Sequence, residues 1–272
     1  LVQVVQGTAV VTIVLNLIAL WKQERMSPMT RAARAEPRPQ FRDAWRDFTT
    51  GSDAGRLLVV VFIGTMAFQM QDVLLEPYGG EVMGLSVSAT TLLTAMWAAG
   101  ALIGFGLAAR WLKDGINPYR MAARGILAGI AAFTAVILAN PLGSVALFYA
   151  GTTLIGFGGG LFAVAMLTAA MGLPVTGKAG RGLALGAWGA AQATGAGLSI
   201  MIGGTMRDVI NHAALNGDLG TVLASKATGY GAVYHTEIAL LFVTLIALGP
   251  LVRTRALNAG NPDGLRLSGF PT

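Results

Sequence analysis

Two carboxylates within a mostly apolar part of the chain are the first residues whose spacing could do chemistry. Asp72 and Glu76 are four positions apart, so a continuous helix would place both on one face, next to Gln69. Two carboxylates held close together in a low dielectric bind a proton more readily, which favours a proton-coupling site. The alternative is a solvated pair at a helix end, with Pro77 ending that helix.

The composition places these residues in a membrane protein. Hydrophobic residues make up 54% of the chain and charged residues 12%, whereas soluble domains carry about 25% charged residues. The chain has no cysteine, only two histidines and no Gly-Lys-Ser/Thr phosphate-binding loop. We therefore expect no enzyme, no catalytic residue, no metal site and no nucleic-acid partner.

Segments without Asp, Glu, Lys or Arg predict the membrane helices, because a helix needs about 20 apolar residues to cross a bilayer. Seven are predicted, since the turn Asn140-Pro141-Leu142-Gly143 divides the longest segment in two. The segments are Leu1–Trp21, Leu57–Gln71, Val82–Ala109, Gly125–Gly177, Gly182–Met206 and Ile238–Val252. The fold class predicted is an all-α polytopic membrane protein.

The helices are rich in glycine. Four pairs have small-xxx-small spacing, which predicts close helix packing. They are Gly100 with Gly104, Gly125 with Gly129, Gly156 with Gly160, and Gly182 with Gly186. The run from Gly156 to Gly160 could instead open one helix face to a flat, bulky partner.

The basic residues predict the orientation. All of them except Arg207 and Lys226 fall on one side of the seven-span arrangement, and basic loops favour the cytoplasm. The central loop and the C-terminus are therefore predicted to be cytoplasmic. The long connection on the other side, from Arg207 to Thr236, contains a predicted short helix around Leu219–Lys226; His212 and His235, in or beside the connection, are expected to be solvated.

Four parts are predicted. Residues 1–21 form a membrane helix, residues 22–55 a cytoplasmic linker, residues 56–252 a six-helix membrane domain and residues 253–272 a cytoplasmic tail. Within the linker, Phe41, Trp45 and Phe48 have the spacing of an amphipathic helix lying in the membrane interface. Because the chain opens within an apolar helix and without Met, we expect it to be the later part of a longer protein.

Several runs are more specific than apolar filler. They are FQMQDVLLEPYGG from Phe68 to Gly80, GLSV from Gly84, WAAGAL from Trp97 and GLALGAWGAAQ from Gly182 to Gln192. In these runs the chain resembles the PucC-type, or bacteriochlorophyll-delivery, branch of the major facilitator superfamily, most clearly over residues 41–210. The resemblance implies a major-facilitator-like helical bundle, in which the seven spans are the sixth helix and the C-terminal six.

The resemblance also implies a function. Proteins of this type are multi-pass proteins of the bacterial inner, photosynthetic (intracytoplasmic) membrane, where lipids surround them. The resemblance therefore implies a protein that assembles light-harvesting antenna complexes. It would do so by binding bacteriochlorophyll and delivering it to antenna polypeptides. A reaction-centre complex is a further possible partner. Two alternatives stay open: a proton-coupled transporter of a small solute that uses Asp72 and Glu76, and a structural subunit of a photosynthetic complex.

Bacteriochlorophyll gives the polar residues another use, because its magnesium accepts one axial ligand and its ring needs an apolar, flat-walled slot. Trp97 and Trp188 lie inside apolar segments, where an indole can stack on a pigment ring or pack against helices. The candidate pigment-binding residues are Gln69, Gln71, Asp72, Glu76, Trp97, Trp188 and Gln192. No single one of them stands out as the magnesium ligand.

Overall fold

The computed structural model describes residues 10–15, 17–18, 40–50, 53–173 and 181–259. The chain divides into two units, residues 1–40 and residues 41–272. In the first unit, residues 10–15 and 17–18 are helical and exposed. Most of the predicted span Leu1–Trp21 lies outside the described residues.

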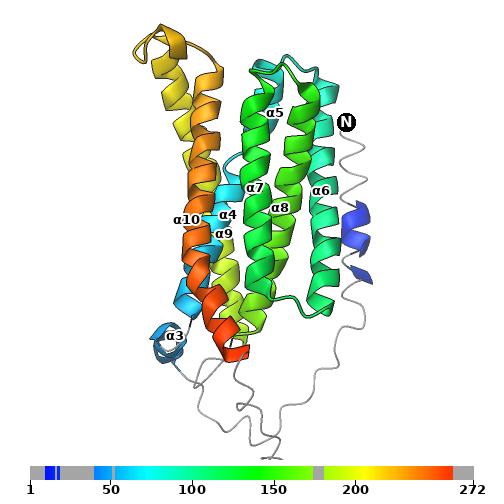
Figure 1. Ribbon diagram of the computed structural model, residues 1–272, viewed down its shortest axis with the longest axis vertical. Helices are drawn as coiled ribbons and strands as arrows, with labels where there is room; N and C mark the ends of the chain where they lie inside the picture. The colour runs from blue at the N-terminus through cyan, green and yellow to red at the C-terminus, as the bar shows by residue number, and fades with distance from the viewer. Residues whose placement is uncertain (1–9, 16, 19–39, 51–52, 174–180, 260–272) are drawn as a thin grey trace, which may run out of the picture. The chain divides into compact units, whose positions relative to one another are not determined.

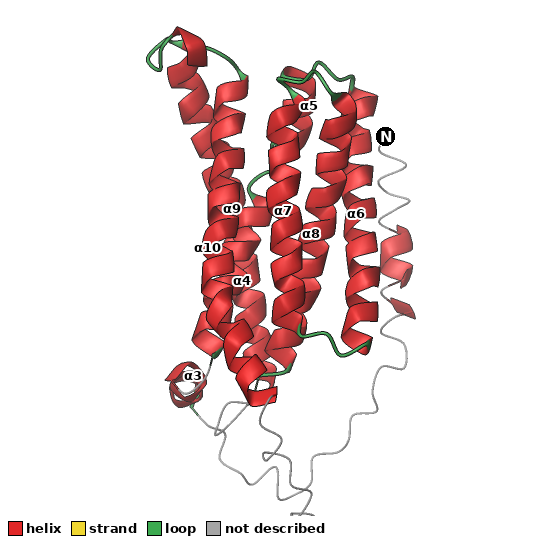
Figure 2. Ribbon diagram, viewed as in Figure 1, coloured by secondary structure: helices red, strands yellow, loops and turns green. Residues whose placement is uncertain are grey.

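In the described part of the second unit, helices are joined by turns and loops and there is no strand (Figure 2). The α-helices are α3 (Phe41–Thr50), α4 (Ala54–Gln69), α5 (Leu75–Glu81), α6 (Val87–Lys113), α7 (Pro118–Ala139), α8 (Val145–Met171), α9 (Arg181–Leu215) and α10 (Ala227–Ala259). A short 3-10 helix, η1 (Thr221–Leu223), lies between α9 and α10. The predicted all-α class is therefore confirmed.

The long helices pack in two groups (Figure 1). In one group α8 packs extensively against α6 and α7, and in the other α4, α9 and α10 contact one another. Contacts of α10 with α7 and of α4 with α8 join the groups into one bundle. The core between them is apolar and includes Phe68, Phe133, Phe148 and Met166.

Local sequence signals explain several helix ends. The side chains of Ser86 and Ser144 accept hydrogen bonds from the backbone N–H groups of Ala89 and Leu147, which caps α6 and α8. The predicted turn at Asn140–Gly143 is present between α7 and α8, and Gly143 has a φ of 58°. A residue with a side chain would be strained at that backbone angle, so glycine allows the tight turn.

Four described helices are long and apolar enough to cross a membrane, or up to five if α3 and α4 are counted as one bent span. The four are α6, α7, α8 and the part of α10 from Ala227 to Arg253. Helix α9 is long enough, but its glycines and its polar residues such as Gln192 reduce its hydropathy. Helix α4 has 16 residues, and at 1.5 Å per residue it is about 24 Å long, shorter than a bilayer core of about 30 Å.

The connection predicted from Arg207 to Thr236 is much shorter in the structure. Helix α9 continues to Leu215 and α10 begins at Ala227, so both helices extend well past the charge-free segments. Charged residues stopped the predicted spans, but they do not stop a helix whose backbone hydrogen bonds are satisfied. The short helix expected around Leu219–Lys226 is the single turn η1.

Helix α3 lies at the predicted amphipathic segment. Ala44 and Phe48 are buried, Phe41 is 71% exposed, and the rings of Phe41 and Trp45 are stacked with their centroids 6.0 Å apart. The segment is thus helical and presents an aromatic side chain outward, as an interfacial helix would. Its position at a membrane surface stays a prediction.

Candidate functional site

One cavity collects four of the predicted pigment-binding residues. It holds about 200 Å³ and lies between α4, α6, α8 and α9. The predicted residues that line it are Gln69 from α4, Trp97 from α6, and Trp188 and Gln192 from α9. They come from three segments far apart in the sequence, so only the fold brings them together.

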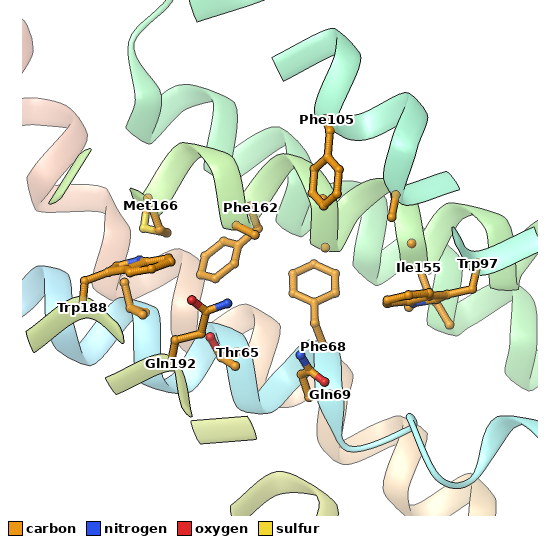
Figure 3. A pocket seen from close by; sticks show the side chains of 16 residues that line it. Thr65, Phe68, Gln69, Trp97, Phe105, Ile155, Phe162, Met166, Trp188 and Gln192 are labelled. Atoms are coloured by element: carbon orange, nitrogen blue, oxygen red, sulfur yellow. The ribbon is translucent and has the colours of Figure 1, made fainter. Parts of the chain in front are cut away.

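The cavity is largely aromatic. Figure 3 shows the indoles of Trp97 and Trp188 at opposite ends, both seen nearly edge-on, with the rings of Phe68 and Phe162 between them. The Phe68 and Phe162 centroids are 5.7 Å apart and their planes are inclined by 36°. Such walls present flat π-faces, which are suited to a planar ring system.

Part of the wall is glycine. Gly156, Gly159 and Gly160 of α8 line the cavity. A Cβ atom on Gly156 would collide with the backbone oxygen of Trp97, and one on Gly160 would lie 2.8 Å from that of Ala101. These glycines therefore let α6 and α8 approach closely, as predicted, and a role in lining a ligand site stays a prediction.

A few polar groups face this apolar space. The side chains of Gln69, Gln192 and Thr65 line the cavity, and Figure 3 shows the two amides on the same side of the aromatic rings in that view. The Nε1 of Trp188 is buried and has no hydrogen-bond partner among the described residues. An apolar slot with a few polar groups that can orient a ligand is the usual composition of a small-molecule site.

The remaining predicted residues lie outside the cavity, because α4 ends at Gln69. Residues 70–74 form turns before α5, so Asp72 and Glu76 do not share a face of one continuous helix, and the expectation that they would was wrong. Gln71 is buried but does not line the cavity. Glu76 is exposed, and its carboxylate accepts a hydrogen bond from the Thr94 hydroxyl. Asp72 is exposed at the surface of the bundle.

The two histidines are on helices and not in a loop. His212 is in the last turn of α9 and His235 in the third turn of α10; both are exposed. Asn216 contacts the Nε2 of His212 at 3.1 Å, and the Nδ1 of His235 lies 2.7 Å from the Gly231 oxygen. Among the described residues, no group of three His, Asp or Glu side chains could hold a metal ion.

Sequence reasoning missed a buried polar cluster on the face of α10 that packs against α4 and α5. Glu237 is fully buried, and its Oε1 accepts a hydrogen bond of 2.6 Å from the backbone N–H of Gln71. Tyr234 and Tyr230, also fully buried, precede it on the same helix. Their spacing, Tyr230, Tyr234 and Glu237, is the i, i+4, i+7 pattern of one helix face and could have found them.

Three comparisons relate the chain to known proteins. A family model described as "PUCC protein" matches residues 1–256. The chain is 55% identical over its whole length to a Rhodobacter capsulatus protein named "Uncharacterized protein in puhA-bchM intergenic region", of which it covers 57%. It is 44% identical over 93% of its length to "Protein PucC" of Cereibacter sphaeroides, of which it covers 54%.

A more distant relative carries a different name. The chain is 31% identical over 85% of its length to the "Bacteriochlorophyll synthase 44.5 kDa chain" of Rhodobacter capsulatus, of which it covers 51%. The chain thus spans about half the length of these curated relatives. No solved structure matches it.

Proposed function

The chain belongs to the PUCC protein family, and from this membership we propose that it is an assembly factor for light-harvesting antenna complexes. It is a multi-pass membrane protein of major-facilitator type. In this proposal it binds bacteriochlorophyll and delivers it to antenna polypeptides in the bacterial inner, photosynthetic membrane. Its partners are these polypeptides or a reaction-centre complex, the pigment and the surrounding lipids.

The observation that carries the proposal is the cavity between Trp97 and Trp188. Its aromatic and glycine walls fit a flat, apolar macrocycle, and the Oε1 of Gln69 or of Gln192 supplies the kind of oxygen that magnesium accepts. The cavity volume of about 200 Å³ is below the roughly 300–1,000 Å³ of typical ligand pockets. We therefore propose that one edge of the ring enters the cavity while the rest of the pigment extends beyond it.

The test is pigment retention. The full-length protein, expressed in a bacterium that makes bacteriochlorophyll and purified in mild detergent, is expected to carry near-infrared absorbance. Trp97→Ala and Trp188→Ala each remove one stacking face worth about 0.5–1.5 kcal/mol, so each is expected to weaken pigment binding about 2- to 10-fold. The pigment-to-protein ratio, measured after extraction, gives the result.

Matched controls separate the cavity from general damage. Trp111→Ala changes an indole of α6 that stacks against Arg124, 4.8 Å away, outside the cavity. Gln40→Leu is the control for Gln69→Leu and Gln192→Leu, because Gln40 is exposed next to α3. The proposal fails if the wild-type protein carries no pigment, or if the controls lose as much pigment as the cavity variants.

Proton-coupled transport of a small solute and a purely structural role are the alternatives. The transport alternative assumed that Asp72 and Glu76 share one helix face, and the structure does not have that arrangement. Uptake that needs a proton gradient and fails in Asp72→Asn would nevertheless support transport. Antenna complexes that change shape in the absence of the protein, with neither pigment nor uptake, would favour the structural role. We propose no enzymatic activity, and we keep the predicted orientation with the central loop and the C-terminus in the cytoplasm.

A further inference from the structure

The carboxyl group of Glu237 is the most deeply buried titratable acid among the described residues. It has no exposed surface, and α10 is helical on both sides of it. Its Oε1 accepts the hydrogen bond from Gln71, while its Oε2 is buried without a partner. Every other carboxylic side chain in the described part of the chain is exposed.

The hydrogen bond to Gln71 joins Glu237 to the break between α4 and α5. Helix α4 ends at Gln69, and the turns over residues 70–74 leave the N–H of Gln71 without a partner in the helix. Glu237 accepts from this donor across the bundle. Its carboxyl group therefore holds α10 against an irregular segment that would otherwise bury an unpaired backbone group.

The surroundings of Glu237 disfavour a negative charge. On its own helix Tyr234 lies one turn before it, and Tyr78 of α5 and Phe133 of α7 pack against the Tyr234 ring. No basic side chain among the described residues pairs with Glu237. A buried carboxylate with one hydrogen bond and no counter-ion is costly, and the neutral acid avoids that cost.

Among the described residues, the tyrosines between Glu237 and the surface all lie toward the N-terminal end of α10. The rings of Tyr230 and Tyr234 both meet Tyr78, with centroids 5.3 and 5.4 Å away. The Tyr230 hydroxyl accepts a hydrogen bond from Arg207 at 2.6 Å and donates to Glu81, whose side chain is 43% exposed.

Toward the other end, the buried face of α10 continues with Leu241, Thr244, Leu248 and Leu251. The Thr244 hydroxyl donates to the Leu240 carbonyl within its own helix. Among the described residues, the polar side chains that lead from this face to the surface therefore lie toward Glu81, and the hydroxyl of Tyr234 between them has no hydrogen-bond partner.

We propose that Glu237 is a proton-binding site, occupied at neutral pH, that exchanges its proton with the side of the membrane where Glu81 and Arg207 lie. Tyr234, Tyr78 and Tyr230 line the way between the buried acid and that surface. The site is separate from the aromatic cavity, so it does not rest on pigment binding.

Infrared spectroscopy of the full-length protein in lipid nanodiscs tests the site. A protonated carboxyl group gives a C=O stretching band that shifts in D2O, and we expect this band at neutral pH in the wild-type protein. It should be lost in Glu237→Gln, whose amide oxygen can still accept from Gln71. Glu76→Gln, a change at an exposed carboxylate, should leave it intact.

Two results would overturn the proposal. One is a wild-type spectrum at neutral pH with only ionised carboxylate bands, which decides the question even if Glu237→Gln does not fold. The other concerns the route: Tyr234→Phe is expected to slow the D2O shift of the band severalfold, whereas the control Tyr149→Phe should not. Equal rates in the two variants would refute exchange past Tyr234.

Pigment retention by Glu237→Gln, measured in the same preparations, keeps this test apart from that of the proposed function. A variant that loses the C=O band but keeps its pigment supports two separate sites. A wild-type protein that shows the band but no pigment supports the proton site alone.

Discussion

The contact between α6 and α8 gives the sharpest stability prediction. A Cβ atom on Gly104 would lie 2.6 Å from the backbone oxygen of Phe157, whereas an ordinary contact begins at 3.4 Å. Gly104→Ala therefore forces the two backbones apart by about 0.8 Å in a region packed as densely as a crystal. Overpacking of this kind costs about 1–3 kcal/mol, and the better helix propensity of alanine offsets at most about 1 kcal/mol.

The matched control is Gly186→Ala. Gly186 belongs to a pair with the same spacing in α9, but nothing lies within 4 Å of the position that its Cβ would take. We expect Gly104→Ala to lower the free energy of unfolding by about 1–2 kcal/mol and Gly186→Ala to raise it by up to about 1 kcal/mol. Reversible unfolding in mixed detergent micelles measures both. The reasoning is refuted if the Gly104 variant is as stable as the Gly186 variant.

Three further predictions concern other parts of the bundle. Arg207→Met should destabilise the protein by about 1 kcal/mol, because it breaks a half-exposed ion pair of 2.7 Å, and a double-mutant cycle with Glu81→Gln should return a smaller, salt-dependent coupling. Asn117→Ala should cost about 1 kcal/mol in thermal or chemical unfolding, since the Asn117 side chain caps α7 at the N–H of Tyr119. Because the chain has no cysteine, an impermeant thiol reagent should label Asp114→Cys only from the cytoplasm and Asp218→Cys only from the opposite side; the reverse pattern would invert the predicted orientation.

The sequence predicted the helices well where its signals are local. Apolar segments located the cores of α6, α7 and α8, and the turn at Asn140–Gly143 separated two of them correctly. The candidate pigment residues were chosen by type, and the cavity unites Gln69, Trp97, Trp188 and Gln192. Their assembly depends on which helices are neighbours, and that information is not present in any one segment.

Glycine spacing alone does not predict which helix faces pack closely. The pairs Gly100–Gly104 and Gly182–Gly186 are indistinguishable in sequence, yet the first packs against the backbone of α8 and the second faces open space beside Leu58 and Phe62 of α4. Small-residue spacing alone therefore shows neither whether another helix comes close nor which helix it is. The partner is determined by the packing of the whole bundle.

Glu237 was not predicted, because the spans were defined by the absence of charged residues. The same would happen in any membrane protein whose spans are defined in this way. A span defined as a segment free of Asp, Glu, Lys and Arg ends at each charged residue, so a buried acid always falls at a predicted boundary and looks like part of a loop. In the structure Glu237 lies well inside α10 and accepts a hydrogen bond from the broken end of α4. The same break separates Asp72 from Glu76, so the feature that removed the predicted carboxylate pair also created the need for the buried one. An acid at the edge of an apolar segment, with tyrosines three and seven residues before it, is therefore worth testing as a residue inside the membrane.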